Sequence, residues 1–220
     1  MQERRRKEIT PSRGPSGEEV RVPEQYWDEM DRLDMEKVGD YALAKNHPPR
    51  GLVLPFLGEV IMVDRVDRCL KRLRDGNWEP IAHRFMELLF LVYLLKVGPE
   101  PVTYDLISVK GLKDAHFFQG PHELTLAPLL ERYGDDPLGF KKAGEFLGGE
   151  AQDMADVAFR ILVFPKVPVY YLFWEGDEEF KPRISVLLDR SVEKHLSADA
   201  IWGIVNLVSD ALLRVPEAFF

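Results

Sequence analysis

The sequence has a single cysteine, Cys69, among its 220 residues. One thiol cannot form an intramolecular disulfide, and it cannot supply the ligands of a cysteine zinc site or an iron–sulfur cluster. Basic residues are also scarce relative to acidic ones, because 29 Lys and Arg stand against 37 Asp and Glu and leave a net charge of −8. Binding of nucleic acid or of an anionic membrane requires a basic surface, so we expect neither as a partner.

Long apolar runs are absent as well. The most apolar stretch, residues 85–95, is interrupted by Glu87, and it is far shorter than the roughly 20 residues that cross a bilayer. The basic start Arg4-Arg5-Arg6-Lys7 is not followed by the apolar segment of a secretory signal. We therefore expect a cytoplasmic protein without a membrane span.

Motifs of common catalytic and nucleotide-binding sites are missing. The chain has no Gly-x-Ser-x-Gly elbow, no Gly-x-Gly-x-x-Gly loop and no Walker A loop. Cys69 lies in a predicted strand with no histidine nearby in the sequence, so we interpret it as a structural residue. The sequence leaves enzymatic activity open, but it favours a non-catalytic role, and it identifies no cofactor.

The composition is that of a folded protein. Hydrophobic residues make up 45% of the chain and aromatic residues 11%, which is enough for a sizeable core. Residues 1–22 carry mixed charge, proline and glycine with almost no apolar side chains. We predict that residues 1–22 are a disordered tail and that residues 23–220 form a single domain.

The hydrophobic periodicity predicts one amphipathic helix from Pro23 to the residues before Asn46, then a linker at Pro48-Pro49. A β-hairpin is expected over residues 52–63. Further strands are expected at 69–73, 104–109, 158–164, 167–174 and 184–188, and further helices at 81–97, from 121, at 137–147 and from 198. Strands grouped at the two ends favour an α+β fold of small antiparallel or mixed sheets with about four to five helices.

The densest acidic segment is Glu175-Gly176-Asp177-Glu178-Glu179, which lies between Trp174 and Phe180. Its carboxylates could hold Mg²⁺ or Ca²⁺ through oxygen ligands. We favour a different interpretation, a turn in which Gly176 adopts a positive φ, one acid braces backbone amides, and the two aromatic residues turn inward. Glu178 and Glu179 are adjacent and point to opposite faces of an extended chain, which argues against convergence on a metal.

Two histidines, His116 and His122, flank Phe117 and Phe118. They are the candidates for a transition-metal site, but no further residues complete a ligand set, so we predict no metal. His47 and His195 are interpreted as linker residues. Phe117, Phe118 and Trp174 could line an apolar ligand pocket, although a core or interface patch explains them equally well.

Residues 164–189 have the pattern Phe-Pro-x-Val-Pro … Leu-x-Trp-x-Gly-Asp-Glu-Glu-Phe-x-Pro … Val-Leu-x-Asp. This pattern resembles an uncharacterised prokaryotic family, domain of unknown function 3786 (DUF3786), seen largely in anaerobes. Supporting segments include residues 54–58, 134–136 and 147–150, and the resemblance covers about residues 38–214. Some relatives look fused to cysteine-rich iron–sulfur modules, which implies work beside redox or corrinoid enzymes, although the single cysteine here does not supply such a module.

We therefore expect a soluble accessory or binding protein that recognises a small molecule, cofactor or protein partner in anaerobic metabolism. The candidate ligand-binding residues are Trp174, Asp177, Glu178, Glu179, Phe117 and Phe118. Two alternatives stay open: a metal-dependent enzyme that uses the acids of residues 175–179 with a histidine, and a structural subunit of a larger complex.

Overall fold

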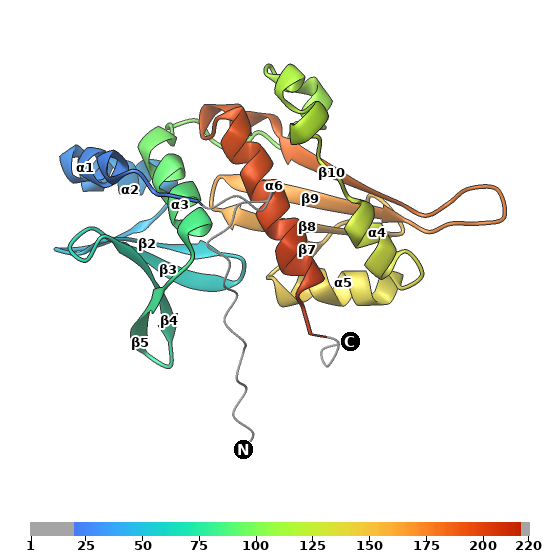
Figure 1. Ribbon diagram of the computed structural model, residues 1–220, viewed down its shortest axis with the longest axis horizontal. Coiled ribbons are helices and arrows are strands. Elements are labelled where there is room, and N and C mark those ends of the chain that lie inside the picture. The colour runs from blue at the N-terminus through green and yellow to red at the C-terminus, as the bar shows by residue number, and fades with distance from the viewer. Residues whose placement is uncertain (1–19, 217–220) are drawn as a thin grey trace.

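Two antiparallel sheets of five strands each organise the chain in the computed structural model, which describes residues 20–216 (Figure 1). The first sheet has the order β1-β2-β3-β4-β5 and consists of β1 (Lys45–His47), β2 (Gly51–Phe56), β3 (Glu59–Asp64), β4 (Cys69–Arg74) and β5 (Asn77–Ile81). The second has the order β6-β10-β9-β8-β7 and consists of β6 (Leu106–Ile107), β7 (Glu150–Ala151), β8 (Val157–Phe164), β9 (Val167–Trp174) and β10 (Arg183–Asp189).

The α-helices of the described residues are α1 (Glu24–Arg32), α2 (Met35–Ala42), α3 (Arg84–Lys96), α4 (Ala127–Tyr133), α5 (Pro137–Phe146) and α6 (Ala198–Leu213). Short 3₁₀ turns are η1 (Val109–Gly111), η2 (Ala115–Phe117), η3 (Gly120–His122) and η4 (Arg190–Lys194). The predicted single α+β domain is confirmed, with slightly more helices than expected. No helix in residues 20–216 is both long and apolar enough to span a membrane.

The single long helix predicted at the start of the chain is wrong, because α1 and α2 are separate. The chain leaves the helical conformation at Leu33 and Asp34, and the Asp34 carboxylate caps α2 by accepting from the N–H groups of Glu36 (3.0 Å) and Lys37 (3.2 Å). A side chain that binds free amides this way favours the start of a helix over its interior. The linker predicted after it begins instead with strand β1.

The predicted tail lies largely outside the described residues. Its last part is described, and there Val20 and Val22 are partly buried against the core. Residues 1–19 are not part of the description, so the tail stays a prediction for them.

The first sheet is a meander joined by tight turns. The β2–β3 hairpin is confirmed, and its turn residues Leu57 and Gly58 both have a positive φ. Asp75 and Gly76 form a similar turn, which leads into β5. The predicted helix at 81–97 is shorter than expected because β5 extends to Ile81 and α3 begins only at Arg84.

Aromatic side chains join the two sheets at the centre of the molecule. Phe90 of α3 packs against Phe56 of the first sheet (4.8 Å between ring centroids) and against Phe164 of the second (4.9 Å). Tyr93, one turn further along α3, stacks on Phe164 at 4.2 Å. These rings are almost fully buried, so burial of apolar area around α3 holds the two sheets in one domain.

The two sheets also contact each other where two glycines lie close together. A Cβ placed on Gly148, after α5, would lie 3.1 Å from the Cα of Gly58, in the β2–β3 turn. Both glycines have a positive φ, which L-residues with side chains rarely adopt. Two of the segments that carry the family pattern therefore meet here.

Helices α4, α5 and α6 cover one face of the second sheet, and the β9–β10 hairpin extends beyond them (Figure 1). Phe140 of α5 packs on Phe159 of β8 (4.9 Å), and the Tyr171 hydroxyl donates to the Val205 carbonyl of α6 (3.1 Å). The strands predicted at 158–164, 167–174 and 184–188 are confirmed. The strand predicted at 104–109 is shorter than expected, because only β6 forms there. The helix predicted to begin at Pro121 begins later: η3 lies at that position, and α4 follows it.

Candidate functional site

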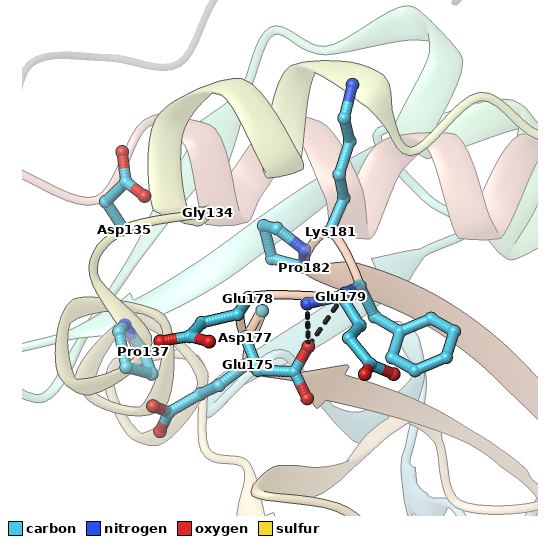
Figure 2. Close-up of a pocket in the computed structure, with 11 residues that line it drawn as sticks. Gly134, Asp135, Pro137, Glu175, Asp177, Glu178, Glu179, Lys181 and Pro182 are labelled. Atoms are coloured by element: carbon cyan, nitrogen blue, oxygen red, sulfur yellow. Dashed lines mark hydrogen bonds between the residues drawn. The ribbon is translucent and has the colours of Figure 1, made fainter.

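A pocket of about 600 Å³ lies beside the loop that joins β9 to β10, here called the hairpin loop (residues 175–182) (Figure 2). One wall is the whole hairpin loop, and the other is the connection between α4 and α5, with Gly134, Asp135 and Pro137. The second wall is set by the start of α5, because the Asp136 carboxylate accepts from Gly139 N–H (2.8 Å) and fixes the chain in front of it.

Asp177 shapes the hairpin loop. Its carboxylate accepts from the N–H groups of Glu179 (2.8 Å) and Phe180 (2.7 Å), and its own N–H donates to the Phe180 carbonyl (2.8 Å). The predicted turn with a bracing acid is confirmed. The expected positive φ at Gly176 is wrong. Glycine is needed there for space, since a Cβ would lie 2.7 Å from the Pro182 ring.

The other carboxylates of the pocket have no bonded partner within the described residues. The carboxylates of Asp135, Glu175, Glu178 and Glu179 form no ion pair or hydrogen bond with any residue of 20–216. Figure 2 shows Glu175 and Glu178 extending toward Pro137, while Glu179 and Lys181 point elsewhere. With Asp177, five carboxylates and a single lysine line the pocket, so its field favours a cationic ligand.

Trp174 and Phe180, the aromatic residues on either side of residues 175–179, differ in how far they are buried. Trp174 is partly buried beside Tyr170 and Leu172, on the sheet face opposite the helices, and the Arg183 guanidinium lies over its ring at 4.1 Å. Phe180 is 69% exposed, so the prediction that it turns inward is wrong. Figure 1 shows that the hairpin that carries this loop extends beyond the helices.

The other predicted site residues do not line this pocket. Phe118 is buried, and Phe117 stacks on His122 at 4.3 Å between centroids. His122 in turn meets Trp202 of α6 edge to face at 5.5 Å, whereas His116 is exposed. The candidates thus divide into an aromatic stack near α6 and the hairpin loop. Within residues 20–216, no three His, Cys, Asp or Glu side chains are arranged to hold a metal ion.

His195, which was interpreted as a linker residue, is fully buried. Its Nδ1 accepts from the Gly98 N–H (3.4 Å), while Lys166 Nζ donates to the Gly98 carbonyl (2.9 Å), so both side chains hold the chain just after α3. Burial, with the nearby Lys166 charge, lowers the pKa of His195 to about 4. A neutral buried imidazole at this position supports the fold. The apolar neighbours Val192 and Leu196 were the only feature of the sequence that could have indicated its burial.

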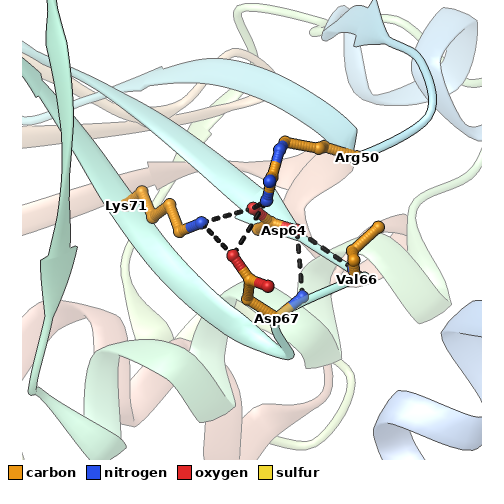
Figure 3. Close-up of polar contacts among 5 residues, drawn as sticks. All are labelled: Arg50, Asp64, Val66, Asp67 and Lys71. Atoms are coloured by element: carbon orange, nitrogen blue, oxygen red, sulfur yellow. Dashed lines mark hydrogen bonds and ion pairs between the residues drawn. The ribbon is translucent and has the colours of Figure 1, made fainter.

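A second polar group, which was not predicted from the sequence, is the charge cluster of Arg50, Asp64, Asp67 and Lys71 (Figure 3). Asp64 is fully buried and accepts from Arg50 Nη1 (2.6 Å), Lys71 Nζ (2.7 Å) and the N–H groups of Val66 (3.0 Å) and Asp67 (3.1 Å). Burial raises the pKa of Asp64, but the hydrogen bonds from Lys71 and Arg50 outweigh it and lower the pKa to about 2. Two acids and two bases balance each other here.

Comparison with known proteins adds a family and no function. No curated protein and no solved structure matches the chain. Two parts of the family pattern, Gly134-Asp135 and residues 175–182, lie far apart in the sequence, and both line the pocket. The model of the family described as domain of unknown function (DUF3786) matches residues 34–211, and the chain therefore belongs to that family.

Proposed function

We propose that this protein is a non-catalytic accessory protein that binds a basic segment of a partner protein at the pocket of the hairpin loop. One observation carries the proposal: Asp135, Glu175 and Glu178 line one cavity, and none of the three carboxylates forms an ion pair within residues 20–216. Uncompensated carboxylates around an open pocket attract Lys and Arg side chains and steer their approach.

Phe180 supports a protein partner over a small cation. Its ring is 69% exposed beside the pocket, and an exposed aromatic ring next to charged groups is typical of a residue that anchors a protein interface. The hairpin loop also extends from the body of the domain, where a large partner can reach it (Figure 1). The metal-dependent alternative gains no support, because the Asp177 carboxylate is engaged in the turn and Glu179 points away from Glu175 and Glu178.

The test uses a fluorescent Lys-Lys-Gly-Lys-Lys peptide and the full chain, with binding followed by fluorescence anisotropy. We expect binding that weakens as salt rises, because exposed charges are screened beyond about 8–10 Å at 0.1–0.15 M salt. The double variant Glu175→Gln/Glu178→Gln is expected to lose about tenfold in affinity. The matched control Glu29→Gln/Glu36→Gln, which removes two exposed charges from α1 and α2, is expected to bind like the wild type.

Two results would contradict the proposal. Equal losses in both double variants would mean that the net charge of −8, and not the pocket, attracts the peptide. Spermidine that binds as tightly as the peptide and is insensitive to Phe180→Ala would point to a small cation as the ligand.

A further inference from the structure

Strand β10 has an open edge in the second sheet. Its neighbour β6 pairs with it at Leu188 and Asp189, whereas β9 pairs with its other side from Arg183 to Leu188. Within residues 20–216 no strand pairs with the outer side of residues 183–187. Figure 1 shows β10 at the border of the sheet, leading from β6 to the hairpin loop with no strand beyond it on this stretch.

The free backbone groups on this edge can be assigned to residues. The Arg190 N–H donates to the Asp105 carbonyl on the β6 side (2.8 Å). Because the backbone groups of successive residues alternate between the two sides of a strand, those of Ile184 and Val186 point to the same side as those of Arg190. No described residue hydrogen-bonds to them on that side. Each of the two therefore offers one N–H and one C=O to an incoming strand.

The middle of this edge, residues 184–187, has no charge, proline or bulge in its own sequence that would block pairing. Exposed edges are normally blocked by charges, prolines or bulges, because a bare edge is a template for another strand. Pro182 and Arg183 stand at its beginning, but residues 184–187 are Ile, Ser, Val and Leu, and their pairing with β9 is regular. The side chains of Ile184 and Val186 are buried in the core, so the position of the strand is fixed before any partner binds.

We propose that the open edge of β10 binds an extended peptide of the partner protein as an added antiparallel strand, whose following basic residues reach Glu175 and Glu178. The proposal rests on the function proposed above and names the form of the partner. β10 runs from the hairpin loop toward β6, so an antiparallel peptide runs toward the loop and delivers its C-terminal residues to the acidic pocket. Main-chain pairing supplies affinity, and charge complementarity selects the partner.

A second copy of this chain fits the edge less well than a peptide. If two copies of β10 paired antiparallel about Ser185, Pro182 and Lys181 of one would lie across from Leu188 and Asp189 of the other. Those two positions are already paired with β6. A short peptide has no such extension and can end at the loop.

The experiment compares capped peptides of one composition, Thr-Val-Thr-Val-Thr-Lys-Lys and Lys-Lys-Thr-Val-Thr-Val-Thr, with a form of the first that is N-methylated at alternate residues on its pairing side. Amide hydrogen exchange of the full chain is read by NMR. We expect the first peptide to slow exchange at Ile184 and Val186 at least tenfold. Ser185 and Leu187 face β9 and should exchange slowly with or without peptide. The reversed and N-methylated peptides should bind at least tenfold more weakly.

The outcomes separate this inference from the proposed function. A basic peptide that binds through Glu175 and Glu178 but leaves exchange at Ile184 and Val186 unchanged overturns the added strand and leaves the acidic pocket standing. No binding at about 1 mM overturns the added strand as well. Protection of the two amides that rises with protein concentration, without peptide, would assign the edge to a second copy.

Discussion

The charge cluster and the hairpin loop use the same side-chain types in opposite ways. In the charge cluster, Asp64 and Asp67 share two cations, Arg50 and Lys71, so the four charges cancel (Figure 3). In the hairpin loop, Glu175 and Glu178 face a pocket with no ion-pair partner in the described residues (Figure 2). The first arrangement closes a turn between two strands, whereas the second leaves negative charge for a molecule outside the chain.

The difference follows from where each segment lies in the fold. Asp64 ends β3 on a packed sheet, where an unpaired carboxylate would be costly and its partners come from neighbouring strands. The hairpin loop extends beyond the helices, where water solvates each carboxylate and folding does not require a counter-charge. Acidic residues in the first region should therefore govern stability, and those in the second should govern binding.

The largest expected effect is that of Asp64→Asn. This change removes the buried charge that Arg50 and Lys71 contact, and leaves Lys71, whose side chain is 12% exposed, without its buried partner. We expect a loss of about 3–5 kcal/mol in the free energy of unfolding, measured by urea denaturation. Asp67→Asn is the matched control, because Asp67 is 47% exposed and should lose less than about 1 kcal/mol. Equal losses in the two variants would contradict the expectation, because they would mean that the burial of Asp64 adds nothing to its contribution.

Acid should remove the same contribution gradually. The folded-state pKa of Asp64 is about 2, below its ordinary 3.8, so the unfolded chain binds the proton first as pH falls. The stability from Asp64 is fully present above pH 3.8 and is lost as pH falls toward 2, by about 2 kcal/mol. The measurement is the difference in unfolding free energy between wild type and Asp64→Asn across this range. A difference that does not shrink with acid would contradict the low pKa.

The sequence predicted the fold better than the site, for reasons that particular residues make clear. Apolar alternation and turn residues located β2, β3, β8, β9 and β10, because these strands bury side chains in a regular pattern. The break at Asp34 was missed, since the apolar spacing continues across it and only the cap distinguishes two helices from one. The second strand of the β4–β5 hairpin was missed because Asn77 to Ile81 carries Pro80 and little apolar periodicity.

The site depended on contacts between distant segments, which a single sequence does not reveal. The acids of residues 175–179 were recognised, but their partner wall at Gly134 and Asp135 lies about forty residues earlier in the chain. Phe180 was expected to be buried because it is apolar, yet its side chain is exposed on a loop outside the core. His195 was overlooked for the opposite reason, as its burial arises from Gly98 and Lys166 in other elements.

A smaller effect on the free energy of unfolding is expected for Asp177→Ala. Asp177 combines features of the charge cluster and of the hairpin loop. Asp177 belongs to the hairpin loop, but its carboxylate accepts two backbone hydrogen bonds within the turn. We expect a loss of about 0.5–1 kcal/mol, with faster amide exchange at Glu179 and Phe180. Asp177→Asn keeps the accepting oxygen and should retain the turn while it removes a charge. If both variants lost the same stability, the charge and not the acceptor would hold the turn.

The smallest effect on stability is expected for Glu178→Gln, and this variant tests the comparison most directly. Its carboxylate contacts no described cation, so the unfolding free energy should stay within about 0.5 kcal/mol of the wild type. Peptide binding should nevertheless weaken about threefold or more, because one of the acids that face the pocket has lost its charge. Glu179→Gln is the matched control on the same loop: it removes the same charge one residue away, but its side chain points elsewhere (Figure 2). Equal binding losses in the two variants would mean that the loop acts through its total charge, whereas a loss confined to Glu178→Gln means that the direction of the carboxylate decides.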